Sequence, residues 1–586
     1  MGYREDNALK NKKIAPVIAV GVLIVLVVLI TLATKFIQRY IPSKEHQNMD
    51  EYYHLTAEDD MAIVLNDSVQ DTTCKYLDGR VYIDYKTVHD LLNERFYWDA
   101  NENILLYTLP DNLITVPAGG SAYQVGKENK TTDYTIVRND SDVMYMALDF
   151  VKEYTNLTYT VFEDPNRVVI TTVWGEVETV SVKKDSEIRL KGGIKSPIVK
   201  EAAKEEKLTV LDADKTWTKV ATTDGIVGYI KSKAISAAKK TVRSNDFTKP
   251  EFTHITRDFT IQLAWHQVTN QEANASLANM IQNSKGINVI SPTWFWLKDN
   301  SGNIGSLASS DYVNYCHQNG IEVWALASNL VDTNVEMTTY VMTHTSARWN
   351  LVNQLISAAI QYDLDGINLD FESIDPAAGD GYVQFVRELS LKCANNNIVL
   401  SVDNYVPTDY TSFYNRAEQA KFADYVIIMG YDEHYAGSKE GSVASLGFVK
   451  EGVANTLLEV PAEQIILGCP FYTRIWALTP KEETDTVEAA SEDYVPYEVS
   501  SEAIGMDNVM RRLEINGAVP GWSEEDGQNY AEYENEGITY KVWLEDAKSL
   551  ALKLEVMKSN NLAGAAFWKL GFETDSIWDT IIKYTN

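Results

Sequence analysis

Residues 365–372 read Asp-Gly-Ile-Asn-Leu-Asp-Phe-Glu, and this octapeptide decides the fold of the surrounding domain. Successive side chains of a strand point to opposite faces. One face carries three apolar side chains and the other carries an amide and two carboxylates: Ile367, Leu369 and Phe371 against Asn368, Asp370 and Glu372. Burying such polar groups without partners is costly, so their face must line an occupied polar place. The carboxyl end of a barrel strand that opens into a cleft is such a place.

The octapeptide lies within a long region, residues 251–586, in which strand candidates alternate with helices. This mid-domain position argues against the alternative of an edge strand with a solvated polar face. The eight predicted strands are Thr260–Trp265, Ile287–Ile290, Ile321–Leu326, Gly366–Glu372, Ile398–Val402, Tyr425–Met429, Ile465–Gly468 and Ala563–Trp568. The pattern predicts an α/β fold, a (β/α)8 TIM barrel. The long interval before the last strand predicts an insertion near 475–542 that adds a wall to the cleft.

The octapeptide resembles the active-site signature Asp-x-x-Asp-x-Asp-x-Glu of the family-18 glycoside hydrolases, the chitinase-like enzymes. Asp365, Asp370 and Glu372 match the signature, with Asp365 and Gly366 structural in the motif, and Asn368 stands at its second Asp. Two carboxylates on one strand cannot flank a glycosidic bond from opposite faces, as ordinary retaining enzymes require. The resemblance implies substrate-assisted retention: Glu372 is the general acid and base, the substrate's 2-acetamido oxygen attacks, and Asp370 orients that group.

Asn368 is the departure from the family pattern, and it is expected to bind the substrate. An amide can donate a hydrogen bond to Asp370 but cannot titrate, so a coupled carboxylate pair is expected to be absent. Similar Asn-containing motifs belong to the bacterial branch with spore-cortex and germination hydrolases. The resemblance therefore favours peptidoglycan over chitin.

Further segments fit the same resemblance. Met429-Gly430-Tyr431-Asp432 resembles the Met-x-Tyr-Asp motif, which implies that Tyr431 bonds the acetamido oxygen and that Asp432 and Met429 bind the sugar. Trp568 would form the floor of the pocket. Weaker candidates for the cleft walls are Trp543, Trp294, Trp296 and Trp324. Neither His266 nor His434 has a nucleophile or a metal partner at a recognisable spacing. They are therefore expected to support the site from behind other residues and not to act on the substrate. No metal and no cofactor is expected.

Length and composition bound the rest of the chain. The 586 residues predict three or four domains, and a net charge of −31 argues against a nucleic-acid partner. The four cysteines have no paired spacing, which disfavours a zinc site or a disulfide framework. Three of them, Cys316, Cys393 and Cys469, are predicted to be small core residues.

An apolar run without charge, residues 14–34, is long enough to cross a membrane. The basic residues before it predict that residues 1–13 stay in the cytoplasm and that the rest of the chain lies outside. The run exceeds the apolar core of a cleaved signal peptide, so an uncleaved anchor is favoured. We expect a single-pass protein of the cell membrane, with an acidic stalk at 35–60.

Two small modules are predicted between the stalk and the barrel. Residues 61–175 contain a predicted duplication of strand, helix, strand, turn and strand. This segment resembles the α+β domain named after the N-terminal region of copper amine oxidases, without a copper ligand cluster. Residues 176–238 read as a small all-β module that resembles bacterial SH3 domains, through Trp217, Asp224-Gly225 and Gly228-Tyr229-Ile230. Its expected role is either binding of cell-wall peptide or that of a rigid spacer. Residues 239–250 are predicted to be a linker.

Together these features predict a membrane-anchored, surface-exposed bacterial hydrolase of the N-acetylglucosaminidase type. Its substrate would be a β-1,4-linked glycan that contains N-acetylglucosamine, with peptidoglycan favoured. A chitinase or chitooligosaccharide hydrolase is one alternative. A catalytically inactive wall-binding protein on the same fold is the other, and the presence of both Asp370 and Glu372 speaks against it.

Overall fold

The computed structural model describes residues 6–140, 143–481 and 496–585. The chain divides into two compact units. One combines Met1–Glu94 with Tyr134–Lys249, and the other combines Arg95–Asp133 with Pro250–Asn586.

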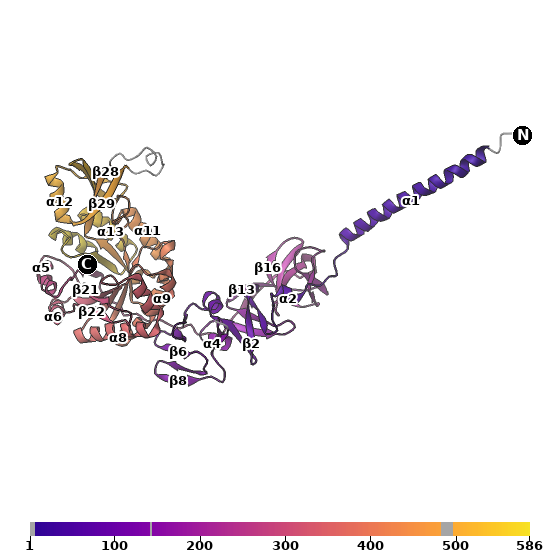
Figure 1. Ribbon diagram of the computed structural model, residues 1–586, viewed down its shortest axis with the longest axis horizontal. Coiled ribbons are helices and arrows are strands. Elements are labelled where there is room, and N and C mark those ends of the chain that lie inside the picture. Colours follow the sequence, from indigo (N-terminus) through magenta and orange to yellow (C-terminus); the bar gives the residue numbers. More distant parts are fainter. Residues whose placement is uncertain (1–5, 141–142, 482–495, 586) are drawn as a thin grey trace. The chain divides into compact units, whose positions relative to one another are not determined.

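Eight parallel strands of the second unit close into a barrel, which confirms the predicted fold class (Figure 1). In sheet order they follow β20-β33-β27-β26-β25-β24-β23-β21, and β21 pairs with β20 to close the circle. The strands are β20 (Ile261–His266), β21 (Val289–Leu297), β23 (Glu322–Ser328), β24 (Gly366–Asp370), β25 (Val399–Tyr405), β26 (Tyr425–Met429), β27 (Ile465–Pro470) and β33 (Gly564–Trp568). All eight predicted strands are present. The short β22 (Ile304–Ser306) adds an antiparallel neighbour to β21.

Helices surround the barrel and bury the apolar face of each strand (Figure 1). Ile367, Leu369 and Phe371 join this outer core, as the alternation predicts. Helix α8 (Thr345–Tyr362) ends at Asp363, whose backbone is left-handed (φ 55°), and the chain then turns into β24. The helices are α5 (Leu277–Met280), α6 (Ser310–Gln318), α7 (Val335–Thr343), α8 (Thr345–Tyr362), α9 (Gly379–Asn395), α10 (Arg416–Phe422), α11 (Leu446–Thr456), α13 (Ala547–Ser559) and α14 (Trp578–Thr585).

An antiparallel sheet is inserted between the last two barrel strands, where the sequence predicts an insertion. Its strand order is β29-β28-β32-β31-β30, and α12 (Met506–Ile515) contacts it through Val509 and Leu513. The strands are β28 (Tyr472–Pro480), β29 (Tyr497–Gly505), β30 (Gly521–Ser523), β31 (Gln528–Asn535) and β32 (Ile538–Leu544).

A second antiparallel sheet, from residues 95–133, belongs to the same compact unit as the barrel. Arg95 donates to Glu418 of α10 (Nε–Oε1 2.7 Å), and the Asp99 carboxylate accepts from the backbone and hydroxyl of Thr345. Breaking buried pairs of this kind is strongly destabilising, which fixes this sheet to the outer helices. Its strands are β4 (Phe96–Asp99), β5 (Ile104–Thr108), β6 (Leu113–Pro117), β7 (Ala122–Val125) and β8 (Glu128–Thr131).

The first unit begins with α1 (Asp6–Tyr40), which contains an apolar segment, Val17–Tyr40, long enough to cross a membrane. Two seven-stranded sheets follow, ordered β11-β12-β1-β2-β3-β10-β9 and β15-β14-β18-β17-β16-β13-β19. The strands of the first sheet are β1 (Asp60–Leu65), β2 (Ser68–Leu77), β3 (Arg80–Asp84), β9 (Val137–Asp140), β10 (Val143–Ala147), β11 (Thr158–Phe162) and β12 (Arg167–Thr171). Those of the second are β13 (Gly175–Ser181), β14 (Ser186–Arg189), β15 (Ile198–Ala202), β16 (Lys207–Ala213), β17 (Trp217–Thr222), β18 (Val227–Lys231) and β19 (Lys239–Arg243).

Two connecting segments of this unit are more ordered than the sequence indicates. Lys239–Arg243, the predicted start of a linker, forms β19 and pairs with β13. Part of the predicted stalk forms helix α2 (Met49–Tyr52). Tyr53, which follows this helix, is fully buried, and its hydroxyl donates a hydrogen bond to the Gly225 carbonyl at 3.1 Å. Burial of this tyrosine anchors the segment to the β13–β19 sheet.

Candidate active site

Glu372 lies just beyond the end of β24, at the carboxyl ends of the barrel strands. The strand stops at Asp370, so the prediction that it runs to Glu372 is wrong by two residues. The reason is the backbone of Ser373, which turns into a left-handed conformation (φ 51°). The side-chain amide of Asn329 holds the turn, since it donates to the Glu372 carbonyl (2.8 Å) and accepts from its N–H (2.9 Å).

The Glu372 carboxyl has one strong side-chain partner. The Tyr405 hydroxyl, at the end of the neighbouring strand β25, donates to Oε2 at 2.7 Å. Burial raises the pKa of Glu372, the Tyr405 hydrogen bond lowers it, and the Asp432 charge raises it again. A raised pKa keeps a carboxyl protonated toward neutral pH, which a general acid requires. The sequence analysis did not identify Tyr405, which lies three residues after the predicted strand Ile398–Val402 and ends the observed β25.

Asp370 is buried, and its Oδ1 has no hydrogen-bond partner among the described residues. Burial raises its pKa well above the usual range, and the charges of Asp403 and Glu372 raise it further. An unpartnered buried carboxylate oxygen is costly unless a proton or a ligand satisfies it. Asp370 is therefore set up to bind a donor that enters the barrel mouth.

Asn368 is fully buried one layer deeper, and its amide is satisfied by the barrel itself. Oδ1 accepts from Trp265 Nε1 (2.8 Å) and Ser291 (3.0 Å), and Nδ2 donates to Ser401 (3.1 Å) and Asp403 (2.7 Å). The expected hydrogen bond to Asp370 is not formed, because both amide protons point to strand β25. Asp403, a buried carboxyl that the sequence reading overlooked, takes that bond instead.

Tyr431 and Asp432 follow the end of β26 and approach the same place. The partly buried Tyr431 contacts Trp265 edge-on, with ring centroids 6.5 Å apart. Burial raises its pKa well above the usual range, and the charges of Asp403, Tyr472, Asp370 and Glu372 add to this. Asp432 is about half exposed, with side-chain exposure of 46%, and accepts from the Tyr472 hydroxyl at 2.6 Å.

Aromatic and sulfur-containing side chains line the barrel around these polar groups. Trp568, at the end of β33, is partly buried and meets Trp265 edge-on at 5.9 Å. Met429 is buried at the end of β26. The floor role predicted for Trp568 and the sugar contact predicted for Met429 stay predictions.

The predicted cleft tryptophans separate into different places. Trp294 and Trp324 are fully buried, so the prediction that they line the cleft is wrong; Trp324 stacks on Tyr425, 5.5 Å between centroids. Trp543 belongs to β32 of the inserted sheet and donates from Nε1 to Asp526 at 3.0 Å. It lines a shallow depression of about 450 Å³ together with Trp522 and Tyr530.

The remaining motif residues have structural partners. Asp365 accepts from the backbone N–H of Val323 at 2.8 Å and pairs with His317. A Cβ at Gly366 would approach the Trp324 ring to 2.7 Å, so no larger residue fits there. His266 is buried beside Tyr312, and burial lowers its pKa to about 4. His434 bonds the Ser442 carbonyl at 2.8 Å.

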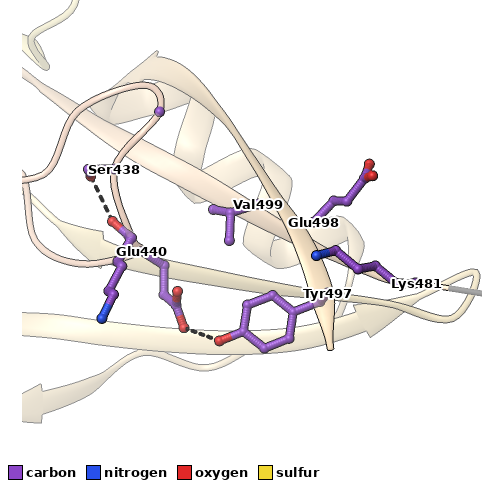
Figure 2. Close-up of a pocket in the computed structure, with 8 residues that line it drawn as sticks. Ser438, Glu440, Lys481, Tyr497, Glu498 and Val499 are labelled. Atoms are coloured by element: carbon purple, nitrogen blue, oxygen red, sulfur yellow. Dashed lines mark hydrogen bonds between the residues drawn. The ribbon is translucent and has the colours of Figure 1, made fainter. Parts of the chain in front are cut away.

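A larger hollow of about 750 Å³ lies at the far end of the inserted hairpin β28–β29 (Figure 2). Figure 2 shows the Tyr497 hydroxyl pointing at Glu440, with a hydrogen bond of 3.2 Å. Lys541 forms an ion pair with the same carboxylate at 3.1 Å. The residues that line this hollow do not include Asp370, Glu372, Asp403 or Asp432. In the described part of the chain, no three His, Cys, Asp or Glu side chains are grouped as for a metal ion.

The barrel region is similar to known proteins in sequence and fold. The family model "Glycosyl hydrolases family 18" matches residues 225–573. The glycosylase YvbX of Bacillus subtilis is 26% identical over 312 residues, which cover 51% of this chain and 85% of that protein. The cortical fragment-lytic enzyme of Bacillus anthracis is 23% identical over 267 residues, 43% of this chain and 59% of that one. The C-terminal domain of a putative chitinase from Desulfitobacterium hafniense superposes with a TM-score of 0.50 at 19% identity, over 56% of this chain and all of that domain.

Proposed function

Because this chain belongs to family 18 of the glycosyl hydrolases, we propose that it cleaves β-1,4 bonds of glycans containing N-acetylglucosamine by substrate-assisted retention. The observation that carries the proposal is that Asp370 and Glu372, at and just beyond the end of β24, and Tyr431, just beyond the end of β26, lie at the same end of the barrel. These groups supply a protonatable carboxyl and a second carboxyl, but they do not flank a bond from opposite faces as two-carboxylate retention requires.

In the proposed reaction, Glu372 donates its proton to the glycosidic oxygen as that bond breaks. The carbonyl oxygen of the substrate's 2-acetamido group forms the new bond to the anomeric carbon, which gives an oxazolinium ion. Asp370 accepts a hydrogen bond from the acetamido N–H and stabilises the positive charge of the oxazolinium ion. The Tyr431 hydroxyl donates a hydrogen bond to the acetamido oxygen. Water then adds to the anomeric carbon as the bond between that carbon and the acetamido oxygen breaks, and the water gives a proton to Glu372. Asp432 and Trp568 would hold the sugar.

We propose peptidoglycan as the substrate and the outer face of the cell membrane as the location. Similarity to a cortical fragment-lytic enzyme supports the substrate. The apolar helix Val17–Tyr40, with basic residues before it, supports an anchor whose C-terminal side is extracytoplasmic. The β13–β19 sheet would then be placed to contact wall peptide.

The test is to incubate the chain without residues 1–40 with purified peptidoglycan and, separately, with chitin, and to identify the released ends by mass spectrometry. New N-acetylglucosamine reducing ends from peptidoglycan are expected. Release from chitin alone would assign the chitinase alternative. Binding to either polymer without release would assign the inactive wall-binding alternative.

The mechanism has a separate test. Peptidoglycan that is de-N-acetylated at the cleavage site lacks the attacking oxygen, so it should resist hydrolysis, and a thiazoline mimic of the oxazolinium should inhibit. Equal cleavage of both glycans, or a sugar ester trapped on Asp370, would contradict substrate assistance.

A further inference from the structure

A second buried carboxyl, Asp403, lies beside Asp370 on the neighbouring barrel strand. Strands β24 and β25 are parallel, with Asn368 opposite Ser401 and Leu369 opposite Val402, so the same register places Asp370 opposite Asp403. Both strands contribute alternate residues to the barrel interior, which Asn368 confirms by bonding Ser401 and Asp403. Neighbouring strands are about 4.8 Å apart, so the two carboxyl groups face each other at short range.

The surroundings of this pair oppose two negative charges. Asp403 is buried, with 3% exposure, and Asp370 is buried with 7%. The charges that act on them are acidic and raise their pKa values: Asp403 and Glu372 act on Asp370, and Glu372 acts on Asp403. Three phenols that interact with the Asp370 charge have raised pKa values and are neutral near neutral pH: Tyr431 after β26, Tyr382 of α9 and Tyr414 before α10. Two buried carboxylates at this separation cannot both ionise near neutral pH.

We propose that Asp403 is the proton-sharing partner of Asp370, and that it supplies from strand β25 the second carboxyl that Asn368 cannot supply from strand β24. This inference rests on the proposed hydrolase mechanism for its kinetic consequence. Its physical content, one proton shared between two cross-strand carboxyl groups, does not depend on the substrate.

The hydrogen bonds indicate where the proton lies before substrate binds. Asp403 Oδ1 accepts from the Asn368 amide at 2.7 Å, which stabilises its ionised form. Asp370 Oδ1 has no partner among the described residues, which favours its protonated form. When the acetamido N–H arrives, the O–H bond of Asp370 breaks and an O–H bond forms on Asp403. Asp370 thereby becomes the anion that the oxazolinium needs, with no net change in protons.

The identity of residue 368 gives this inference its sharpest test. In the double variant Asn368→Asp, Asp403→Asn, the carboxyl and the amide exchange places. An amide at 403 can still donate to a carboxylate at 368, so the bond persists with its direction reversed. Trp265 and Ser291 can still donate to the side chain at 368. The exchange therefore keeps both the shape and a carboxyl partner for Asp370.

The first measurement is a pH titration of the buried carboxyl band by infrared difference spectroscopy, with the Asp370 band identified by its loss in Asp370→Asn. The repulsion of two charges about 5 Å apart at an effective dielectric of roughly 20 corresponds to about two pH units. We therefore expect the Asp370 midpoint to fall by one to two units in Asp403→Asn and to return toward the wild-type value in the double variant. Ser401→Ala is the matched control, since it removes the other Asn368 partner on β25 without removing a carboxyl, and it should leave the midpoint in place.

The second measurement is kcat/KM on N-acetylated glycan. Asp403→Asn should lower it by roughly 10²-fold, the lower end of proton-transfer contributions, because a protonated Asp370 then has no carboxylate to take its proton. The double variant should recover most of this loss. A midpoint that is unchanged in Asp403→Asn, an equal midpoint shift in Ser401→Ala, or a double variant no better than Asp403→Asn would overturn the proposal. The titration needs no turnover, so a failure to cleave peptidoglycan or chitin would refute the proposed function while leaving this result to be judged on its own.

Discussion

The hydrogen bond from Tyr405 to Glu372 should set the alkaline limit of activity. In Tyr405→Phe the ring stays and the hydroxyl that donates to Oε2 at 2.7 Å is removed. That hydroxyl stabilises the ionised carboxylate and so lowers the pKa of Glu372. Without it, the pKa rises and Glu372 stays protonated to higher pH. Because the proposed general acid acts in its protonated form, the alkaline limb of kcat/KM should move to higher pH.

The size of the shift follows from the type of bond. A hydrogen bond to a charged group contributes about 1.5–3 kcal/mol, and one pKa unit corresponds to 1.36 kcal/mol, so the limb should move by roughly one to two units. Turnover at the optimum should fall as well, because Glu372 loses a partner that orients it.

The assay is a profile of kcat/KM against pH on a soluble N-acetylated oligosaccharide, with circular dichroism to verify folding across the range. Tyr414→Phe is a matched control. The Tyr414 ring contacts Tyr405, with 5.9 Å between ring centroids, but its hydroxyl donates to the Phe371 carbonyl at 3.4 Å and not to Glu372. Its alkaline limb should stay within a few tenths of a unit of wild type. A limb that moves to lower pH in Tyr405→Phe, or does not move while turnover persists, would refute the assignment of Glu372 as the titrating acid.

Three further outcomes are expected. Glu372→Gln should keep the fold and lose about 10²–10⁴-fold in kcat, since an equal-sized amide cannot protonate the leaving oxygen; more than half of wild-type turnover would contradict the acid role. Glu388→Ala should destabilise the barrel unit by about 3–5 kcal/mol in urea unfolding, because it leaves the fully buried Arg348 guanidinium without its carboxylate, whereas the exposed Lys392→Ala should change little. Protease added to intact cells should remove the C-terminal unit, and protection until lysis would place it in the cytoplasm; deletion of residues 14–34 should release the protein from membranes.

The sequence alone was sufficient for the barrel and for the strand that carries the acids. Alternation in residues 366–370 predicts which side chains face the helices, and Ile367 and Leu369 lie in that outer core. These patterns are local, because a strand exposes its two faces with a period of two whatever its neighbours are. The apolar helix near the N-terminus is equally local, since length and composition suffice to predict it.

The partners of the acids were decided by tertiary structure. Tyr405, Asp403 and Asn329 come from strand β25 and the end of β23, and their distances to Glu372 and Asp370 depend on strand register and barrel closure. No spacing along the chain encodes a register between strands that are about 30–40 residues apart. Asn368 illustrates the difference: its place in the motif could be read from the sequence, but its hydrogen-bond partner could not.

The burial of individual side chains also depends on the tertiary structure. Trp324 and Trp568 both lie on predicted barrel strands, yet one is fully buried and the other partly exposed. Residues 95–133 likewise share a compact unit with the barrel, although they lie within residues 61–175, which the sequence predicts to be one domain. The local sequence pattern determines which groups must be buried or hydrogen-bonded, whereas the packing of distant segments determines which neighbours satisfy them. The reason is that an apolar face or a carboxylate accepts any partner of suitable shape and charge that the closed fold brings within reach.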